Sequence, residues 1–100
     1  MAGSSTVANF NLEMGALVRY YEGNDASKDF TDKVYKSATI INDGSDDLTI
    51  EPSGNNMGGY TGGANTVKPG EILTIAPRGG ADQFAIVNAN TSDFRIWLRK

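Results

Sequence analysis

Alternating apolar and polar positions recur along this chain in short runs that are separated by polar turns. The alternation is clearest over 16–22, 33–41 and 93–99, and a period of two is the spacing of side chains on the two faces of a β-strand. Further extended segments are expected at 48–52, 66–68, 72–76 and 83–88. About seven short strands at spacings of roughly ten residues predict an all-β fold, either an antiparallel β-sandwich or a small barrel.

The segment Ile40–Ile50 reads I-I-N-D-G-S-D-D-L-T-I, with β-favouring residues at both ends and a polar centre. Asp43-Gly44 is a strong hairpin signal, because the turns that match strand twist need positive φ and Gly or Asp adopts it easily. We therefore predict a β-hairpin, whose second strand ends at Pro52 because proline cannot donate to a ladder. A second pair of extended segments, within Thr66–Ile75, flanks the turn Pro69-Gly70.

Residues 12–21 fit two patterns. Leu12, Ala16 and Tyr20 would share one face of a helix, but the run Val-Arg-Tyr-Tyr also alternates as a strand would. Gly15 would weaken a helix interior, and β-branched and aromatic side chains suit a pleated sheet, so we predict a strand over 16–22.

Three segments lack a periodic pattern. Residues 1–15 begin with small and polar side chains and are predicted to form a flexible N-terminal arm ahead of a single domain over 16–100. Gly23–Asp32 is polar with Phe30 as its one aromatic residue, which indicates a loop. Pro52–Asn65 carries five of the twelve glycines and is predicted to be a long mobile loop.

Composition excludes several classes of function. The chain has 100 residues and a net charge of −3, which does not suit a nucleic-acid partner. It has no Cys and no His, so thiol nucleophiles, thiolate metal sites and the usual general base near neutral pH are all missing. No apolar run approaches the ~20 residues that span a bilayer, and no secretory signal is present. We expect a protein made in a cytoplasm, without a membrane partner, a cofactor or an enzymatic activity.

Carboxylates and other oxygen donors crowd the turn at 42–47. Asp43, Asp46 and Asp47 are the kind of ligand that calcium prefers, which makes them a weak candidate metal site. Their spacing does not match the EF-hand loop, and a solvated turn is the favoured interpretation. In the glycine-rich loop, Met57 and Tyr60 are the large side chains that would become buried against a neighbouring chain.

The last strand separates two kinds of side chain. Phe94, Ile96 and Leu98 would point inward, and Arg95, Trp97 and Arg99 would then form an outward stripe. Trp and Arg are enriched at the hot spots of protein interfaces, so the stripe is a candidate contact surface. The alternative is that Trp97 only covers part of the sheet and that the arginines are solvated.

The chain resembles the small β-rich virion proteins of tailed bacteriophages, in particular accessory head proteins and related adsorption or neck components. The resemblance rests on N-D-G-S-x-D-L-T-I, T-V-K-P-G-E-I-L-T-I and the terminal S-D-F-R-I-W-L-R, and it covers about residues 38–100. In that family a polar hairpin, a V-x-P-G-E turn and an F-R-x-W/Y/V strand recur.

The resemblance implies a structural role, most simply a capsid decoration or cement subunit located in the virion. It implies a symmetric homo-oligomer, with a trimer favoured, that binds the major capsid protein or another virion protein. Phe10 in the arm would add to this contact together with the residues named above. The alternative is a receptor- or carbohydrate-binding module of a phage tail or fibre, with Tyr20, Tyr60 or Trp97 stacking on sugar rings.

Overall fold

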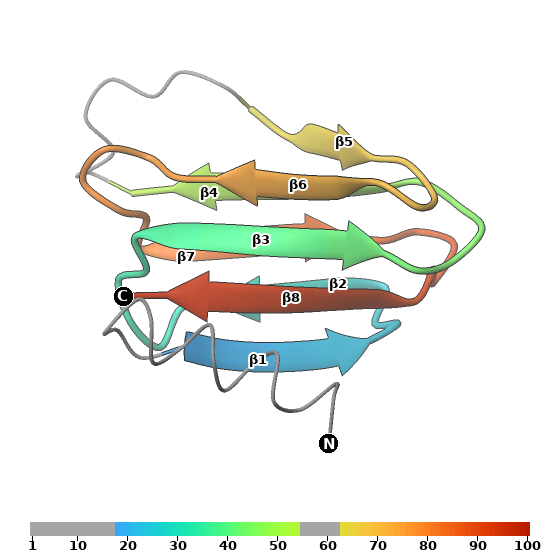
Figure 1. Ribbon diagram of the computed structural model, residues 1–100, viewed down its shortest axis with the longest axis horizontal. Coiled ribbons are helices and arrows are strands. Elements are labelled where there is room, and N and C mark those ends of the chain that lie inside the picture. The colour runs from blue at the N-terminus through green and yellow to red at the C-terminus, as the bar shows by residue number, and fades with distance from the viewer. Residues whose placement is uncertain (1–17, 55–62) are drawn as a thin grey trace.

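The computed structural model describes residues 18–54 and 63–100, which fold as a two-layer β-sandwich (Figure 1). The described residues form eight strands and no helix. In chain order they are β1 Val18–Gly23, β2 Ser27–Phe30, β3 Ser37–Asn42, β4 Leu48–Ser53, β5 Asn65–Val67, β6 Ile72–Ile75, β7 Gln83–Val87 and β8 Phe94–Arg99. The predicted antiparallel β-sandwich is therefore confirmed.

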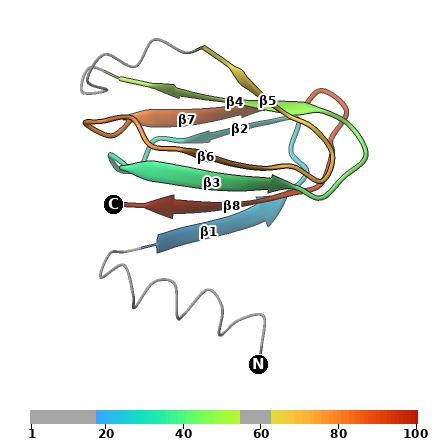
Figure 2. The same ribbon diagram turned by 45° about the horizontal axis from the view of Figure 1, so that its top comes forward.

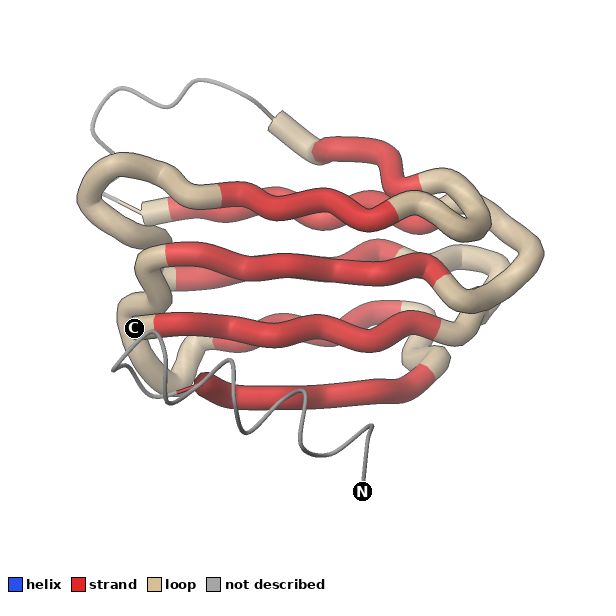
Figure 3. Tube along the Cα trace, viewed as in Figure 1, coloured by secondary structure: helices blue, strands red, loops and turns tan. Residues whose placement is uncertain are grey.

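The strand order is that of a jelly roll. Sheet A has the order β1-β8-β3-β6 and sheet B the order β2-β7-β4-β5, and every neighbouring pair is antiparallel. The two layers are seen obliquely in Figure 2, and Figure 3 shows the described residues as strands joined by loops. Two four-stranded sheets connected in this way are the arrangement found in viral capsid proteins, lectins and cupins.

Four connections cross between the sheets at one end of the sandwich, on the right in Figure 1. We call this the four-loop end, and it comprises residues 24–26, 43–47, 68–71 and 88–93. The opposite end comprises residues 31–36 and 76–82 together with Lys100, which follows β8. This division matters because the loops of one end meet although they are distant in sequence.

The predicted hairpin over Ile40–Ile50 is wrong. β3 lies in sheet A between β8 and β6, whereas β4 lies in sheet B between β7 and β5, so the two strands do not pair. The polar residues 43–47 instead cross the gap of about 10 Å that separates packed sheets. Both flanking isoleucines still face the core, each from its own layer. Turn chemistry marked the chain reversal correctly but could not specify the pairing partner.

One strand lies where a loop was predicted. Within Gly23–Asp32, residues Ser27–Phe30 form β2, which pairs with β7 and places Phe30 opposite Phe84. Phe30 is fully buried, whereas Ser27 and Asp29 point to solvent. The pattern was hidden because a four-residue edge strand carries only one large apolar side chain.

Two strand boundaries also differ from the prediction. β4 continues through Pro52 to Ser53, because Ser53 faces β7 and accepts a hydrogen bond from the Asp82 amide at 2.9 Å. The backbone nitrogen of Pro52 then points toward β5, and the pairing of β4 with β5 stops at Ile50. Proline has no N–H to donate, and at this position no ladder hydrogen bond is lost. β3 begins at Ser37 rather than at residue 33, and Tyr35 forms an isolated bridge with Ala81.

The core fills the space between the two inner faces. Its members include an aromatic group and a layer of isoleucines, all essentially without solvent exposure: Phe30, Tyr35, Phe84, Phe94, Ile40, Ile50, Ile86 and Ile96. They come from both sheets, as the alternating burial of β3, β4, β7 and β8 requires. The predicted inward set of the last strand, Phe94, Ile96 and Leu98, is confirmed.

The predicted turn at Pro69-Gly70 is present. Glu71 donates its amide to the Lys68 carbonyl at 2.9 Å, and Gly70 has a φ of 82°. Proline before a glycine with positive φ is the arrangement of a type II turn. The turn connects β5 of sheet B to β6 of sheet A, so it carries the chain between layers rather than along one sheet.

Candidate binding face on sheet A

A row of four side chains crosses the outer surface of sheet A. The register places Tyr20 beside Trp97, Trp97 beside Thr39, and Thr39 beside Thr74. The Tyr20 and Trp97 rings lie 5.1 Å apart between centroids, tilted by 47°, and the two threonine hydroxyls are 2.9 Å apart. Ring pairs of this separation are favourable, so the two aromatic side chains support one another.

A second row lies nearer the four-loop end. Glu22, Arg95, Ile41 and Ile72 are consecutive neighbours across the four strands. Ile72 keeps 66% of its surface exposed, which is high for a large apolar side chain on a folded domain. The two rows together give an outer face on which aromatic and aliphatic groups are continuous with charged ones.

Arg95 is held in one orientation on this face. Its Nε donates to Asp43 Oδ2 at 2.6 Å, and its Nη2 donates to Asp43 Oδ1 at 2.8 Å. The guanidinium also lies 5.8 Å from the Trp97 ring centroid. The hydrogen bonds from Arg95 hold the pKa of Asp43 below its usual value, so the carboxylate stays charged and the fork-shaped contact persists at neutral pH.

The outer surface of sheet B has a different character. It is formed by small or polar side chains, namely Ser27, Asp29, Thr49, Glu51, Ser53, Thr66, Gln83 and Ala85, with Val87 as its large apolar residue. Val87 is 57% exposed and has no aromatic neighbour in the register, where Ser27 and Thr49 flank it. We define the sheet A face as Tyr20, Glu22, Thr39, Ile41, Asp43, Ile72, Thr74, Arg95 and Trp97. It is the outer surface on which hot-spot residue types gather.

An open hollow of about 460 Å³ lies at the four-loop end of the sheet A face. Its wall is formed by Glu22, Gly23, Asn24, Asp43, Asp93, Phe94 and Arg95. Glu22 and Arg95 belong both to the wall of the hollow and to the second row. The hollow is therefore continuous with the sheet A face, which also carries Tyr20 and Trp97. Polar groups with fixed positions therefore stand next to an aromatic surface.

A buried polar network holds the loops beneath this hollow. Asn42 is fully buried, and its Nδ2 donates to the carbonyls of Asp46 and Val67, both at 2.8 Å. Its Oδ1 accepts from the Gly44 amide at 3.0 Å and from the Ser92 hydroxyl at 2.8 Å. All four hydrogen bonds that this side chain can form are made. The Asn42 backbone also donates to the Glu71 carbonyl and accepts from the Gly70 amide, so one residue connects three of the four loops.

Asn88 connects the remaining loop to the same network. Its side-chain Nδ2 donates to the Ser92 carbonyl at 2.7 Å, and its Oδ1 accepts from the Ser92 amide at 2.9 Å. The backbone N–H of Asn88 donates to the Ala26 carbonyl at 2.8 Å. Asn88 is fully buried and Ser92 is 4% exposed. Satisfied buried networks of this kind give a region one well-defined arrangement.

Gly44 is required by space rather than by dihedral angle. A Cβ on this residue would lie 1.9 Å from Ser92 Oγ and 2.6 Å from the Asp93 amide nitrogen. Its φ is not among the positive values of the described glycines, which belong to Gly54, Gly70 and Gly80. The sequence interpretation of this glycine as a positive-φ hairpin residue is therefore wrong.

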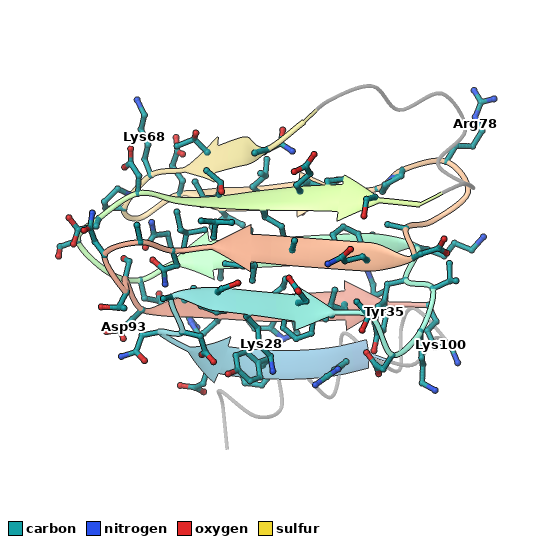
Figure 4. All side chains as sticks on the ribbon, turned by 180° about the vertical axis from the view of Figure 1, so that it is seen from behind. Lys28, Tyr35, Lys68, Arg78, Asp93 and Lys100 are labelled. Atoms are coloured by element: carbon teal, nitrogen blue, oxygen red, sulfur yellow. The ribbon has the colours of Figure 1, made fainter. Side chains whose placement is uncertain are left out.

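The open edge between β1 and β2 is closed by charged and aromatic side chains. Arg19 Nη1 donates to Asp32 Oδ1 at 2.8 Å, and the Tyr35 hydroxyl donates to Asp32 Oδ2 at 2.9 Å. Lys28 Nζ lies 4.7 Å from the Tyr21 ring centroid, and Figure 4 labels Lys28 and Tyr35 on this side. Burial raises the pKa of Tyr35, and its hydrogen bond to Asp32 adds to the increase.

The predicted interface residues fall into three places. Arg95 and Trp97 lie on the sheet A face, each partly buried. Arg99 is near the opposite end of β8, where its Nε donates to Ser37 Oγ at 2.7 Å. Phe10, Met57 and Tyr60, like the predicted arm, lie outside the described residues.

The predicted carboxylate turn does not form a ligand cluster. Asp43 is engaged by Arg95, while Asp46 and Asp47 are exposed at the four-loop end. Within residues 18–54 and 63–100, no group of three His, Cys, Asp or Glu side chains is placed to hold a metal ion. The same ranges contain no helix long and apolar enough to cross a membrane.

Sequence reasoning missed the aliphatic part of the face and the network below it. Ile41 and Ile72 were assigned to strands, but their pairing across sheet A depends on β3 and β6 being neighbours. Asn42 and Ser92 are 50 residues apart. A usable signal was the position of Asn42 at the end of β3 and of Asn88 just after β7. Each continues the inward alternation of its strand, and a buried polar side chain needs hydrogen-bond partners.

Comparisons with known proteins concern the fold. No protein-family model matches the chain, and no curated protein matches it. The crystal structure of PirA is similar with a TM-score of 0.51 at 14% identity, over 83% of this chain and 93% of that one. Drosophila melanogaster CENP-C bound to CAL1 is similar with the same TM-score and identity, over 83% of this chain and 64% of that one. A cupin superfamily protein from Desulfitobacterium hafniense has a TM-score of 0.47 at 10% identity, over 84% and 66%.

Proposed function

We propose that this protein is a structural subunit of a phage virion, most simply a capsid decoration protein, and that it contacts the head through the sheet A face. The observation that carries the proposal is the pairing of Trp97 with Tyr20 beside an Arg95 that is already locked by Asp43. The sequence resemblance supplies the virion context, and the jelly roll is an architecture that viral capsid proteins use.

The side-chain types on the sheet A face suit contact with a protein surface. Tyr, Trp and Arg are the residues most enriched at hot spots, and they act best where neighbouring apolar groups exclude water. Ile41 and Ile72 supply such apolar surroundings, because Ile41 lies beside Arg95 across β3 and β8 and Ile72 lies beside Ile41 on β6. Arg95 loses little conformational entropy on binding, since Asp43 already fixes its guanidinium.

A direct test is binding to phage heads. Heads assembled from the major capsid protein of the same genome are incubated with the purified protein, sedimented, and assayed for bound chain. We expect Trp97→Ala to weaken binding by at least about tenfold, as hot-spot truncation does. Val87→Ala is the matched control, because it truncates an exposed apolar residue on the outer surface of sheet B. Equal binding of Trp97→Ala and the parent protein, or no binding of either, would contradict the proposal.

A receptor- or carbohydrate-binding module is the second candidate, and the hollow at the four-loop end favours it. Sugar rings stack on aromatic side chains. Their hydroxyl groups donate hydrogen bonds to carboxylates and accept hydrogen bonds from guanidinium groups. Tyr20 and Trp97 provide the first kind of contact, and the hollow provides carboxylates and the Arg95 guanidinium. A concave site with a few convergent polar groups is the usual form of a small-molecule site.

A glycan array separates the two candidates. A saccharide module predicts selective binding that is lost in Asp93→Ala, which changes the hollow without removing the Arg95–Asp43 contact. The decoration proposal predicts no glycan binding and head binding that Asp93→Ala leaves intact. Asp93→Ala, assayed for glycan binding and for head binding, therefore assigns the face to one use or the other.

A further inference from the structure

The two ends of the sandwich carry opposite charge. The four-loop end has six carboxylates, Asp25, Asp43, Asp46, Asp47, Glu71 and Asp93, against Lys68. The opposite end has Lys33, Lys36, Arg78 and Lys100 against Asp32 and Asp82. Figure 4 shows Asp93 at one end of the strands and Arg78 and Lys100 at the other.

Most of these charges are not used inside the chain. The ion pairs among the described residues are Arg19–Asp32 and Arg95–Asp43, so they neutralise one carboxylate at each end. Asp46, Asp47 and Asp93 remain exposed at the four-loop end. The four cations of the opposite end are exposed too, and none of them is in an ion pair that the described residues form.

The ends are too far apart to neutralise one another. β3 and β8 each have six residues, and strands of that length span about 20 Å. The Debye length is about 8 Å at physiological ionic strength, so the two ends interact little within one molecule. Each end therefore presents its charge to the solvent.

We propose that copies of this chain associate head to tail, with the four-loop end of one copy against the opposite end of the next. The partner is a second copy because the two surfaces are complementary in charge and belong to the same molecule. Such a contact is heterologous, and heterologous contacts that close produce rings such as a trimer. The inference deepens the proposed function, since it rests on the expected homo-oligomer and names the surfaces that join its subunits.

The proposed contact shares only Asp43 with the sheet A face, and that carboxylate is already paired with Arg95. The other residues of the face lie on β1, β8, β3 and β6, whereas the contact uses the loops beyond the strand ends. A ring built through the ends would carry one copy of the face on each subunit. Several weak face contacts would then act together on a repetitive surface, which raises the overall affinity.

Charge reversal at each end tests this contact. The first variant is Asp46→Lys with Asp47→Lys and Asp93→Lys, which leaves three carboxylates against four lysines at the four-loop end and so makes both ends basic. The second is Lys33→Glu with Lys36→Glu, which makes both ends acidic. The matched control is Asp29→Lys with Glu51→Lys, because those carboxylates are exposed on the outer surface of sheet B. Sedimentation velocity measures the mass of each protein at about 10 mM and about 1 M salt, where the Debye length is about 30 Å and about 3 Å.

We expect the parent protein and the control to associate at low salt and to dissociate as salt increases. Each end variant alone should associate at least about tenfold more weakly, because like charges would then meet at every contact. An equimolar mixture of the two end variants should recover association, since acidic ends again meet basic ends. Thermal unfolding of each variant is the control for folding, and we expect a cooperative transition for all of them.

A parent protein that stays monomeric at low salt would overturn the head-to-tail contact, as would a mixture that fails to associate. Neither result would affect the head-binding assay of Trp97→Ala, which reports on the sheet A face. Conversely, if phage heads do not bind the protein, the result of the charge-reversal experiment is unaffected. The two proposals therefore fail separately.

Discussion

Ser92 occupies the space that a side chain at position 44 would need, so Gly44 and Ser92 are matched across 48 positions of sequence, with a Cβ at Gly44 placed 1.9 Å from Ser92 Oγ. The close approach lets the Gly44 amide and the Ser92 hydroxyl bind the same oxygen, Asn42 Oδ1. Because Asn42 is fully buried, these contacts determine how the loops at the four-loop end sit against one another.

Gly44→Ala should destabilise the fold. The added methyl group meets Ser92 Oγ and the Asp93 amide, and the backbone at that point cannot give way without breaking the Asn42 hydrogen bonds. We expect a loss of about 2 kcal/mol in the free energy of unfolding, measured by urea denaturation. Gly63→Ala is the matched control, because nothing lies within 4 Å of a Cβ there. Equal stability of the two variants would contradict the close-packing account.

Asn42→Ala should cost more than the loss of one hydrogen bond. It leaves the buried carbonyl of Val67 and the Ser92 hydroxyl without their partner. We expect about 3 kcal/mol or more, since each buried polar group left unsatisfied costs about 1–3 kcal/mol. Asn90→Ala removes an exposed amide from the same end and should be nearly neutral. Hydrogen exchange at the Gly44 amide gives a local measurement, with faster exchange expected in Asn42→Ala.

The Asp43–Arg95 pair should give a small, acid-sensitive contribution to stability. The pKa of Asp43 is lowered in the folded protein, so the contribution is present above the unfolded pKa and disappears as pH falls through the folded value. The side chains are 35% and 41% exposed, which limits the pair to about 0–1 kcal/mol. The melting temperatures of the parent protein and Asp43→Asn should differ at pH 6 and converge near about pH 2. A difference that is independent of pH would contradict the role of the ion pair.

Tyr35 should make the fold sensitive to alkali. Its pKa is raised by burial and by the hydrogen bond to Asp32, so the protonated form is favoured in the folded state. The stabilising contribution is complete below the unfolded pKa of about 10 and is lost as pH rises through the folded value. Tyr35→Phe should lower the melting temperature at pH 7, and the difference from the parent protein should shrink above pH 10. A constant difference across that range would show that the hydroxyl is not coupled to folding.

Local sequence was enough to locate the reversals of the chain and most of its strands. The turn at Pro69-Gly70 and the inward set of β8 are determined by residues within a few positions of each other, so short-range reasoning found them. β2 was not predicted, because its pairing with β7 supplies the stability that its four residues lack on their own. Its burial of Phe30 is a property of the sandwich.

The candidate site divides in the same way. Arg95 and Trp97 could be predicted to share an outward face, because a strand alternates with a period of two whatever its neighbours are. Tyr20, Ile41 and Ile72 join that face only because β1, β3 and β6 lie beside β8 or beside its neighbour. Asp43 reaches Arg95 for the same reason.

What the sequence determined by itself is therefore most of the strands, the positions of the turns and the outward stripe of the last strand. The tertiary structure alone decided that the chain crosses between sheets at 43–47, that Asn42, Asn88 and Ser92 meet beneath the loops, and that the two ends differ in charge. The physical reason is that strand formation and turn formation are governed by neighbouring residues. Strand pairing across a jelly roll instead depends on which combination buries all the apolar faces together and satisfies the buried polar groups.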